Sequence, residues 1–305
     1  MIKVRMLAVC VLALCTGLSS NAVFSLDDVR PEPSPVLRIA SKVLDETISD
    51  SERVKLIRSK PEYAADLLKT LVEDIKPGTS EESSRIPWLW EITVFAAEKN
   101  NADTIARILE IAIPKNQMSV ANWQIAVIGG GLIFQMSKSD RDPRGTIEDL
   151  VGRDPLLKER WNKLIAMSQM IVLDENQSLG IRYDALRIFA MSDWSVAKGV
   201  YQQLFSKKDV QSESEKELRL AAVAAIPDFK QEETTEFFVN RFSLLSFTER
   251  EKVCCVLSKN EKAATRLLRS MKNGAISTKL LNRKAIQCFR ANASDRVRRM
   301  AASIF

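Results

Sequence analysis

The 305-residue sequence contains no histidine. Imidazole is the base in Ser-His-Asp and Cys-His nucleophile systems, and it is a ligand in HExxH zinc sites and in CxxCH haem attachment. The absence of histidine excludes these designs. We therefore expect no enzymatic activity, no catalytic residue, no cofactor and no metal site.

Glycine and proline are also scarce, with 10 residues each, and aromatic residues make up only 7% of the chain. Apolar residues recur at helical spacing almost everywhere, without the alternation that is typical of a strand. The sequence therefore predicts an all-α fold. The expected helices are 36–48, 51–58, 61–75, 86–99, 102–113, 119–136, 155–173, 179–191, 194–205, 214–226, 231–242, 247–257, 260–272, 277–290 and 294–304.

Residues 1–22 follow the pattern of a secretory signal peptide. Lys3 and Arg5 precede a 13-residue apolar run, and Ser20 and Ala22 occupy the small positions before a cleavage site. The run is shorter than the ~20 residues that a membrane-spanning helix needs. We expect cleavage after Ala22, a periplasmic or secreted location, and no transmembrane helix in the mature chain.

Cleavage leaves three cysteines, Cys254, Cys255 and Cys288. Three are too few for the disulfide framework of a small exported domain. We interpret them as small apolar residues on buried helix faces. A bridge from Cys254 or Cys255 to Cys288, or between the two adjacent cysteines, stays open.

Short connections predict that successive helices pack as antiparallel pairs. Three segments, 181–186, 218–223 and 297–302, share a β-branched residue or Leu, then Arg, two residues, Ala and an apolar residue. The first two begin 37 residues apart, close to the ~40 of a HEAT or armadillo unit. The Ala would allow close helix approach, and the Arg would reach a carboxylate or a helix terminus. We predict an α-solenoid with HEAT-like repeats over 176–305, after a less regular helical part over 23–175.

Two other motifs favour structural roles. Gly129–Gly131 lack the spacing of a phosphate loop, so they predict close packing or a break in a helix. The five tryptophans lie at mostly apolar positions of separate helices, which favours core packing. They are Trp88, Trp90, Trp123, Trp161 and Trp194.

Charge is unevenly distributed along the chain. Residues 241–305 contain 15 Lys plus Arg and 4 Asp plus Glu, a net charge of +11. The whole chain is +6 and the signal peptide contributes +2, which leaves −7 for residues 23–240. A basic end suits a protein partner with an acidic surface, or the other end of a second copy. The candidate partner-binding residues are Lys262, Arg266, Arg269, Lys272, Lys279, Arg283 and Lys284. Because these cations recur at helical spacing, a solvated face of the solenoid is the alternative interpretation.

Three stretches of the sequence carry a family resemblance: 122–132, 267–277 and 292–305. Together they resemble the HEAT-repeat region of large exported proteins of planctomycetes and verrucomicrobia. In that family a dehydrogenase-like β-propeller precedes the array and a haem-binding c-type cytochrome domain follows it. We expect neither domain here, so the resemblance implies the scaffold and the exported location but no redox residue.

The sequence therefore predicts an exported, non-catalytic scaffold that binds a protein partner, for which a redox or haem protein is a candidate. We expect no nucleic acid as a partner, because an exported protein does not meet the genome. One alternative is a HEAT-like nucleic-acid-binding protein or DNA glycosylase that uses the basic C-terminal face. Another is a remnant of a truncated haem-containing dehydrogenase-like protein.

Overall fold

The computed structural model describes residues 32–115, 119–139, 141–206, 210–229 and 232–305. Every regular element in these ranges is a helix, which confirms the all-α prediction. Residues Ser34–Phe305 form one compact unit. The predicted signal peptide at 1–22 lies outside the described residues. None of the described helices is both long and apolar enough to cross a membrane.

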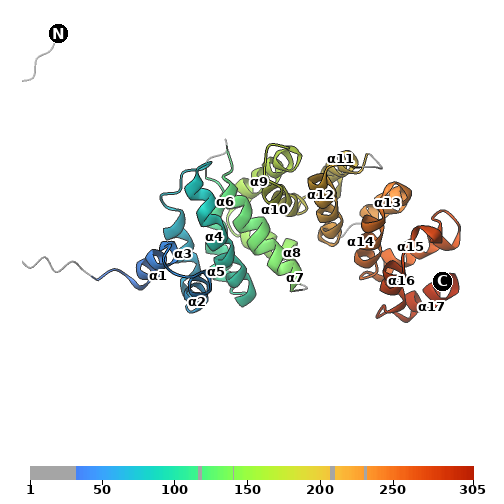
Figure 1. Ribbon diagram of the computed structural model, residues 1–305, viewed down its shortest axis with the longest axis horizontal. Helices are drawn as coiled ribbons and strands as arrows, with labels where there is room; N and C mark the ends of the chain where they lie inside the picture. Colours follow the sequence, from blue (N-terminus) through green and yellow to red (C-terminus); the bar gives the residue numbers. More distant parts are fainter. Residues whose placement is uncertain (1–31, 116–118, 140, 207–209, 230–231) are drawn as a thin grey trace, which may run out of the picture. The chain divides into compact units, whose positions relative to one another are not determined.

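The first part of the unit consists of short helices with one long one (Figure 1). The elements are α1 (Pro35–Leu44), α2 (Asp50–Arg58), η1 (Pro61–Tyr63), α3 (Ala64–Val72), α4 (Ser80–Lys99) and α5 (Ala102–Ala112). Helix α4 starts six residues before the predicted helix 86–99. The Thr79 hydroxyl caps it by accepting from the Glu82 amide at 3.3 Å, so Pro87 lies inside the helix.

The middle part of the unit begins with one continuous helical segment, which consists of α6 (Asn122–Ile125), the π-helical η2 (Ala126–Ile133) and α7 (Phe134–Lys138). Three separate helices follow it: α8 (Pro143–Val151), α9 (Pro155–Leu173) and α10 (Leu179–Phe189). Helix α8 is absent from the predicted set. Pro143 and Gly145 are typical of a turn, but here the proline occupies the first helical turn, where its missing N–H costs nothing.

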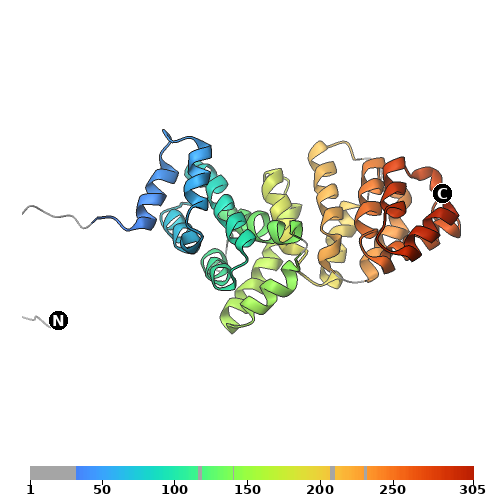
Figure 2. The ribbon, with the colours of Figure 1, turned by 90° about the horizontal axis from the view of Figure 1, so that it is seen from below.

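The C-terminal part, yellow to red in Figures 1 and 2, is a succession of helix pairs. Its elements are α11 (Trp194–Leu204), α12 (Glu213–Ala224), η3 (Ile226–Phe229), α13 (Glu232–Arg241), η4 (Phe242–Leu244), α14 (Phe247–Leu257), α15 (Glu261–Lys272), η5 (Thr278–Leu280), α16 (Arg283–Arg290) and α17 (Asp295–Ile304).

Alternate helices pack beside one another in two rows. One row contains α2, α4, η2, α10, α12, α14 and α16, each in contact with the next. In the other, α1, α3, α5 and α8 are in contact, as are α13, α15 and α17. Buried leucines, isoleucines, valines and alanines fill the space between the rows. Each helix thus buries its apolar stripe against both its hairpin partner and its neighbours in the row.

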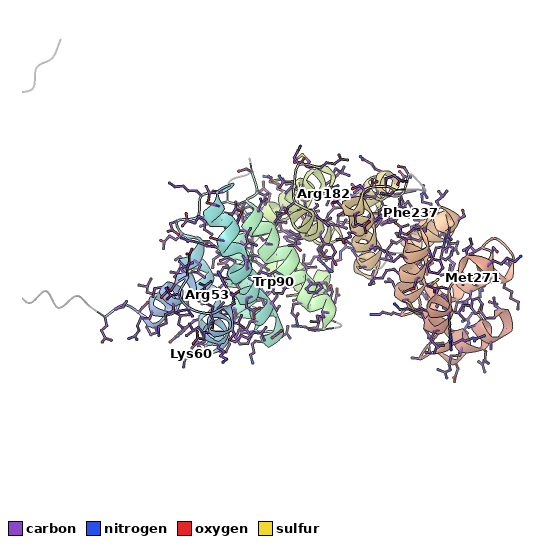
Figure 3. All side chains as sticks on the ribbon, viewed as in Figure 1. Arg53, Lys60, Trp90, Arg182, Phe237 and Met271 are labelled. Atoms are coloured by element: carbon purple, nitrogen blue, oxygen red, sulfur yellow. A yellow bond between two sulfur atoms is a disulfide. The ribbon has the colours of Figure 1, made fainter. Side chains whose placement is uncertain are left out.

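A repeated arginine contact joins the two helices of several pairs. The arginine lies on the second helix and donates to a carbonyl at the end of the first, where backbone acceptors have no partner within the helix. The contacts are Arg53 to Asp45 (2.6 Å), Arg85 to Leu71 (2.8 Å), Arg182 to Val172 (3.0 Å) and Arg250 to Phe242 (3.1 Å). Figure 3 labels Arg53 and Arg182.

The pattern that the three sequence segments share is explained in part by these contacts. Arg182 reaches a helix terminus, as predicted, and Arg219 reaches a carboxylate. Its Nε lies 2.6 Å from Glu249 Oε1, and both side chains are almost fully buried. The alanines of the first two copies, Ala185 and Ala222, have no exposed surface, so both face the core.

The three glycines at 129–131 lie in η2 and allow close packing, as predicted. A Cβ on Gly129 would overlap the Asp184 carbonyl, and one on Gly131 would overlap the Thr93 hydroxyl. A Cβ on Gly130 would lie 2.6 Å from Asp184 Oδ2. At Gly129 and Gly131, η2 therefore lies too close to α10 and α4 to accommodate even a methyl group. The chain is not broken here; it widens into a π-helix.

Candidate functional site

A groove of about 860 Å3 lies where α13 and α15 pack beside each other. Its lining includes the apolar residues Ile226 and Val256 and the buried threonines Thr235 and Thr265. An aromatic cluster behind α13 supports this wall, with ring centroids 5.1–6.3 Å apart. The rings belong to Trp194, Tyr201, Phe205, Phe229, Phe237 and Phe238, and Figure 3 labels Phe237. Stacked and edge-to-face rings of this kind are a rigid support.

Helix α15 presents its polar face to the groove. Lys262, Arg266, Arg269 and Asn273 follow one another at intervals of three or four residues and line it, while Leu267 and other residues of the opposite face are buried. The Asn260 carboxamide caps the helix by accepting from the Ala263 amide at 3.1 Å.

Five cations and two carboxylates line the groove, for a net charge of +3. The cations are Lys259, Lys262, Arg266, Arg269 and Arg296, and the carboxylates are Glu232 and Glu261. They come from α13, the α14–α15 connection, α15 and α17. The groove therefore collects positive charge from residues that are up to 37 positions apart in the sequence.

These cations are poorly compensated within the described part of the chain. Lys262 lies 3.8 Å from Glu232 and Arg296 lies 3.9 Å from Glu261, and all four side chains are at least half exposed. Arg266 makes the closest pair, at 2.6 Å from Glu236. Among the described residues, the side chains of Lys259 and Arg269 make no ion pair. Exposed pairs of this kind are worth little, so an incoming anion can replace them.

The structure brings together only part of the predicted site. Lys262, Arg266 and Arg269 line the groove, whereas Lys272, Lys279, Arg283 and Lys284 do not. Lys284 instead pairs with Glu251 at 2.7 Å. Helical spacing on α15 identified the first three, but Arg296 comes from another helix and has no signal in the local pattern.

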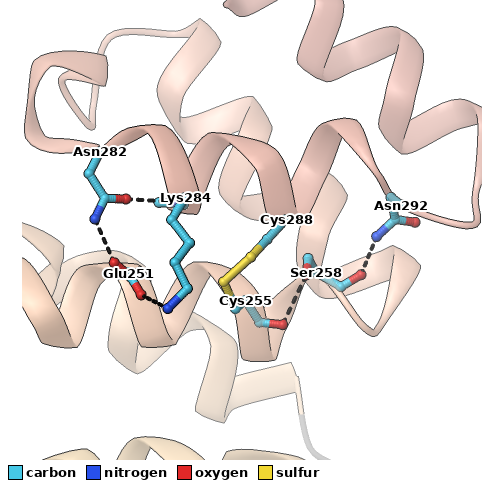
Figure 4. The surroundings of a disulfide bond; sticks show 8 residues. Glu251, Cys255, Ser258, Asn282, Lys284, Cys288 and Asn292 are labelled. Atoms are coloured by element: carbon cyan, nitrogen blue, oxygen red, sulfur yellow. Dashed lines mark hydrogen bonds and ion pairs between the residues drawn. A yellow bond between two sulfur atoms is a disulfide. The ribbon is translucent and has the colours of Figure 1, made fainter.

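A disulfide bond joins α14 and α16 (Figure 4). Cys255 and Cys288 are bonded, with their Cα atoms 5.1 Å apart, while Cys254 is a free buried thiol. The interpretation of all three cysteines as buried apolar residues is therefore correct for Cys254 alone. Burial is the main reason that the pKa of the Cys254 thiol is raised to about 12, so this thiol is unreactive.

The disulfide has a polar neighbour that also links α14 with the start of α16. Glu251 accepts from Asn282 Nδ2 at 2.6 Å and pairs with Lys284 Nζ (Figure 4). These two contacts hold the pKa of Glu251 below its usual range. Since α15 lies between Cys255 and Cys288 in the sequence, the cations of α15 belong to a segment that is fixed at both ends.

The remaining candidate residues do not form a site. Trp123, Trp161 and Trp194 are buried in the core, as predicted, and Trp88 packs against it with the Arg53 guanidinium 4.8 Å from its ring. The described residues contain no group of three acidic or cysteine side chains that could hold a metal ion.

Asp184, which packs on η2, is the most perturbed carboxyl group in the described part of the chain. Burial raises its pKa to about 7, and the nearby Arg187 lowers it only in part. The Arg187 guanidinium is already engaged by the Phe134 and Tyr183 rings, at 4.6 and 4.9 Å. None of the described residues donates a hydrogen bond to the Asp184 carboxyl group.

No protein-family model matches the chain, and neither the curated proteins nor the solved structures contain a match.

Proposed function

We propose that this chain is an exported, non-catalytic HEAT-type α-solenoid that binds an acidic segment of a protein partner in the groove between α13 and α15. The observation that carries the proposal is the convergence of five cations from three places in the chain around one groove. A binding groove of this kind needs no histidine and no metal.

The repeat assignment has three supports. The helices pack in two rows, consecutive helices form pairs, and an arginine of the second helix binds the end of the first in several pairs. These are features that a stack of similar helical units has in common, and such stacks use extended surfaces for binding.

Export is supported by two independent features. Residues 1–22 have the charged, apolar and small-residue segments of a signal peptide. The Cys255–Cys288 bond is of the kind that persists in the periplasm and outside the cell and is rare in the cytosol.

A peptide segment suits the groove because its lining is mixed. Apolar residues such as Ile226, Pro227 and Val256 lie beside the cations. The apolar residues offer contact area, and the cations select acidic side chains and speed association. The family resemblance makes a redox or haem protein one candidate for such a partner.

The test is the affinity of the mature protein for a labelled peptide of alternating Glu and Ser, measured by fluorescence anisotropy. We expect R266Q/R269Q to weaken binding at least tenfold, because it removes two groove cations. The matched variant K272Q/K279Q loses the same charge outside the groove and should bind as the unmodified protein does. Affinity should also fall with added salt.

Two outcomes would overturn the proposal. Equal loss of affinity in both variants would mean that net charge, not the groove, attracts the peptide. Absence of peptide binding together with salt-sensitive, groove-dependent binding of duplex DNA would favour the nucleic-acid alternative.

A further inference from the structure

The segment 45–52, made of the α1–α2 connection and the first turn of α2 and called here the acidic loop, carries the densest negative charge of the chain. The eight residues 45–52 include four carboxylates, Asp45, Glu46, Asp50 and Glu52, and no cation, and no other eight-residue window of the sequence reaches −4. All four residues are exposed. The negative charge of this acidic loop is complementary to the positive charge of the groove between α13 and α15.

Local hydrogen bonds fix the shape of the acidic loop. Asp45 Oδ1 accepts from the Thr47 amide at 2.9 Å and from its hydroxyl at 2.7 Å. Glu52 Oε2 accepts from the Ser49 hydroxyl at 2.8 Å, in a capping box at the start of α2. These contacts lower the pKa of both carboxyl groups, which stay ionised at neutral pH. A preformed, charged loop loses little conformational entropy on binding.

Two carboxylates of the loop remain available to a partner. The Asp50 side chain is 85% exposed, and its ion pair with Arg53 is loose at 3.7 Å. Glu46 is exposed and makes no ion pair with any described residue. In the groove, the exposed ion pairs of Lys262 and Arg296 are equally loose. Lys259 and Arg269 make no ion pair with a described residue.

The loop and the groove belong to opposite ends of the helix order. Helices α1 and α2 contact α3 and α4, whereas α13 and α15 contact each other, and α15 contacts α14 and α17. We infer that the acidic loop of one copy docks in the groove of a second copy, so that chains associate head to tail. This inference rests on the proposed acid-binding groove and names its occupant.

Such a contact is heterologous, because the two partners contribute different surfaces. The chain at one end of such an assembly therefore keeps a free loop and the chain at the other end keeps a free groove, and assembly continues unless a ring closes. Continued association with rising concentration distinguishes head-to-tail assembly from a symmetric dimer, which stops at two chains.

The test is the mass of the mature protein in solution, measured by light scattering over a range of protein concentrations at low and high salt. We expect the mass to rise above that of the monomer with concentration at low salt, and to return to the monomer at high salt. The loop variant E46Q/D50N and the groove variant R266Q/R269Q, which remove charge without reversing it, should each be monomeric alone. The control E62Q/E73Q neutralises two exposed charges elsewhere and should associate as the unmodified protein does.

An equimolar mixture of the loop and groove variants provides the decisive measurement. It contains one intact groove and one intact loop, so we expect it to form a dimer and no larger species. A monomeric unmodified protein at every concentration, or a mixture that stays monomeric, would overturn the inference. If the acidic peptide still binds the groove in that case, the proposed function stands; if it does not, both fall.

Discussion

At the scale of single residues, Asp184 combines burial with an acid–base property that the sequence did not reveal. Its carboxyl group lies against Gly130, where a side chain would meet it at 2.6 Å, and receives no hydrogen bond that the structure records. Desolvation disfavours the charged form, which is why its pKa is raised to about 7. In a chain without histidine, this aspartic acid titrates where an imidazole normally does.

The raised pKa predicts that Asp184 makes the folded state less stable as pH rises. Below pH 3.8 the group is protonated in both the folded and the unfolded chain. From there to about pH 7 the unfolded chain loses the proton and the folded chain keeps it, so stability falls. D184N should remove this loss of stability. Its free energy of unfolding should exceed that of the unmodified protein by up to about 4 kcal/mol at pH 8 and differ little at pH 4.

Urea unfolding of both proteins between pH 4 and pH 8 checks this. D174N is a control of opposite sign, because hydrogen bonds from Asn176 lower the pKa of Asp174. That variant should lose stability at pH 8. Parallel pH profiles for D184N and the unmodified protein would contradict the prediction.

At the scale of elements, η2 illustrates how backbone geometry depends on residues from two neighbouring helices. Gly129 faces the backbone of α10 and Gly131 faces Thr93 of α4. We expect G129A to lower the free energy of unfolding by roughly 3 kcal/mol, because the added methyl group would overlap a backbone carbonyl that cannot move alone. G130A should cost less, since the Asp184 side chain can rotate away.

Two helical glycines are matched controls for this series. Gly180 in α10 and Gly199 in α11 have open space where a Cβ would lie. G180A and G199A should be neutral or stabilising by up to about 1 kcal/mol, because alanine favours the helix. Thermal unfolding of G129A, G130A, G180A and G199A measures these differences. An equal change of stability in all four variants would contradict the steric role of Gly129 and Gly131.

Most helices could be predicted from the sequence because their ends carry local signals. Helix α14 begins at the residue after Ser246, which forms a capping box with Glu249, and it was predicted at 247–257 as observed. Helix α8 was missed because Pro143 and Gly145 suit both a turn and a first helical turn. The early start of α4 also escaped prediction, since Pro87 is rarely found inside a helix.

The groove was harder to predict than the helices because it depends on pairing between elements. The period of α15 identified Lys262, Arg266 and Arg269 as one face. No local pattern shows that Arg296 of α17 joins them, or that Lys284 is held by Glu251. The choice of Cys255 over Cys254 as the partner of Cys288 likewise depends on which face of α14 meets α16.

At the scale of the whole molecule, the disulfide bond ties the C-terminal helices together. It closes a loop of 33 residues, for which the chain-entropy model gives a stabilisation of ~3–4 kcal/mol. We expect C255S/C288S to lower the denaturant midpoint of unfolding, and a reducing agent to do the same to the unmodified protein. The variant is its own control, because a reductant should not affect it further. An unchanged midpoint on reduction would contradict a stabilising bond.

The same bond also determines which parts of the chain stay connected if the backbone is cut. Cys255 and Cys288 enclose α15 and the segment that follows it, so the groove cations of α15 lie on a covalent ring. A protease that cuts once at the exposed Lys279 opens the ring but releases no fragment until the disulfide is reduced. The nicked protein would keep its unreduced mass, apart from one added water, because the disulfide holds the fragment that follows the cut to the fragment that contains α15.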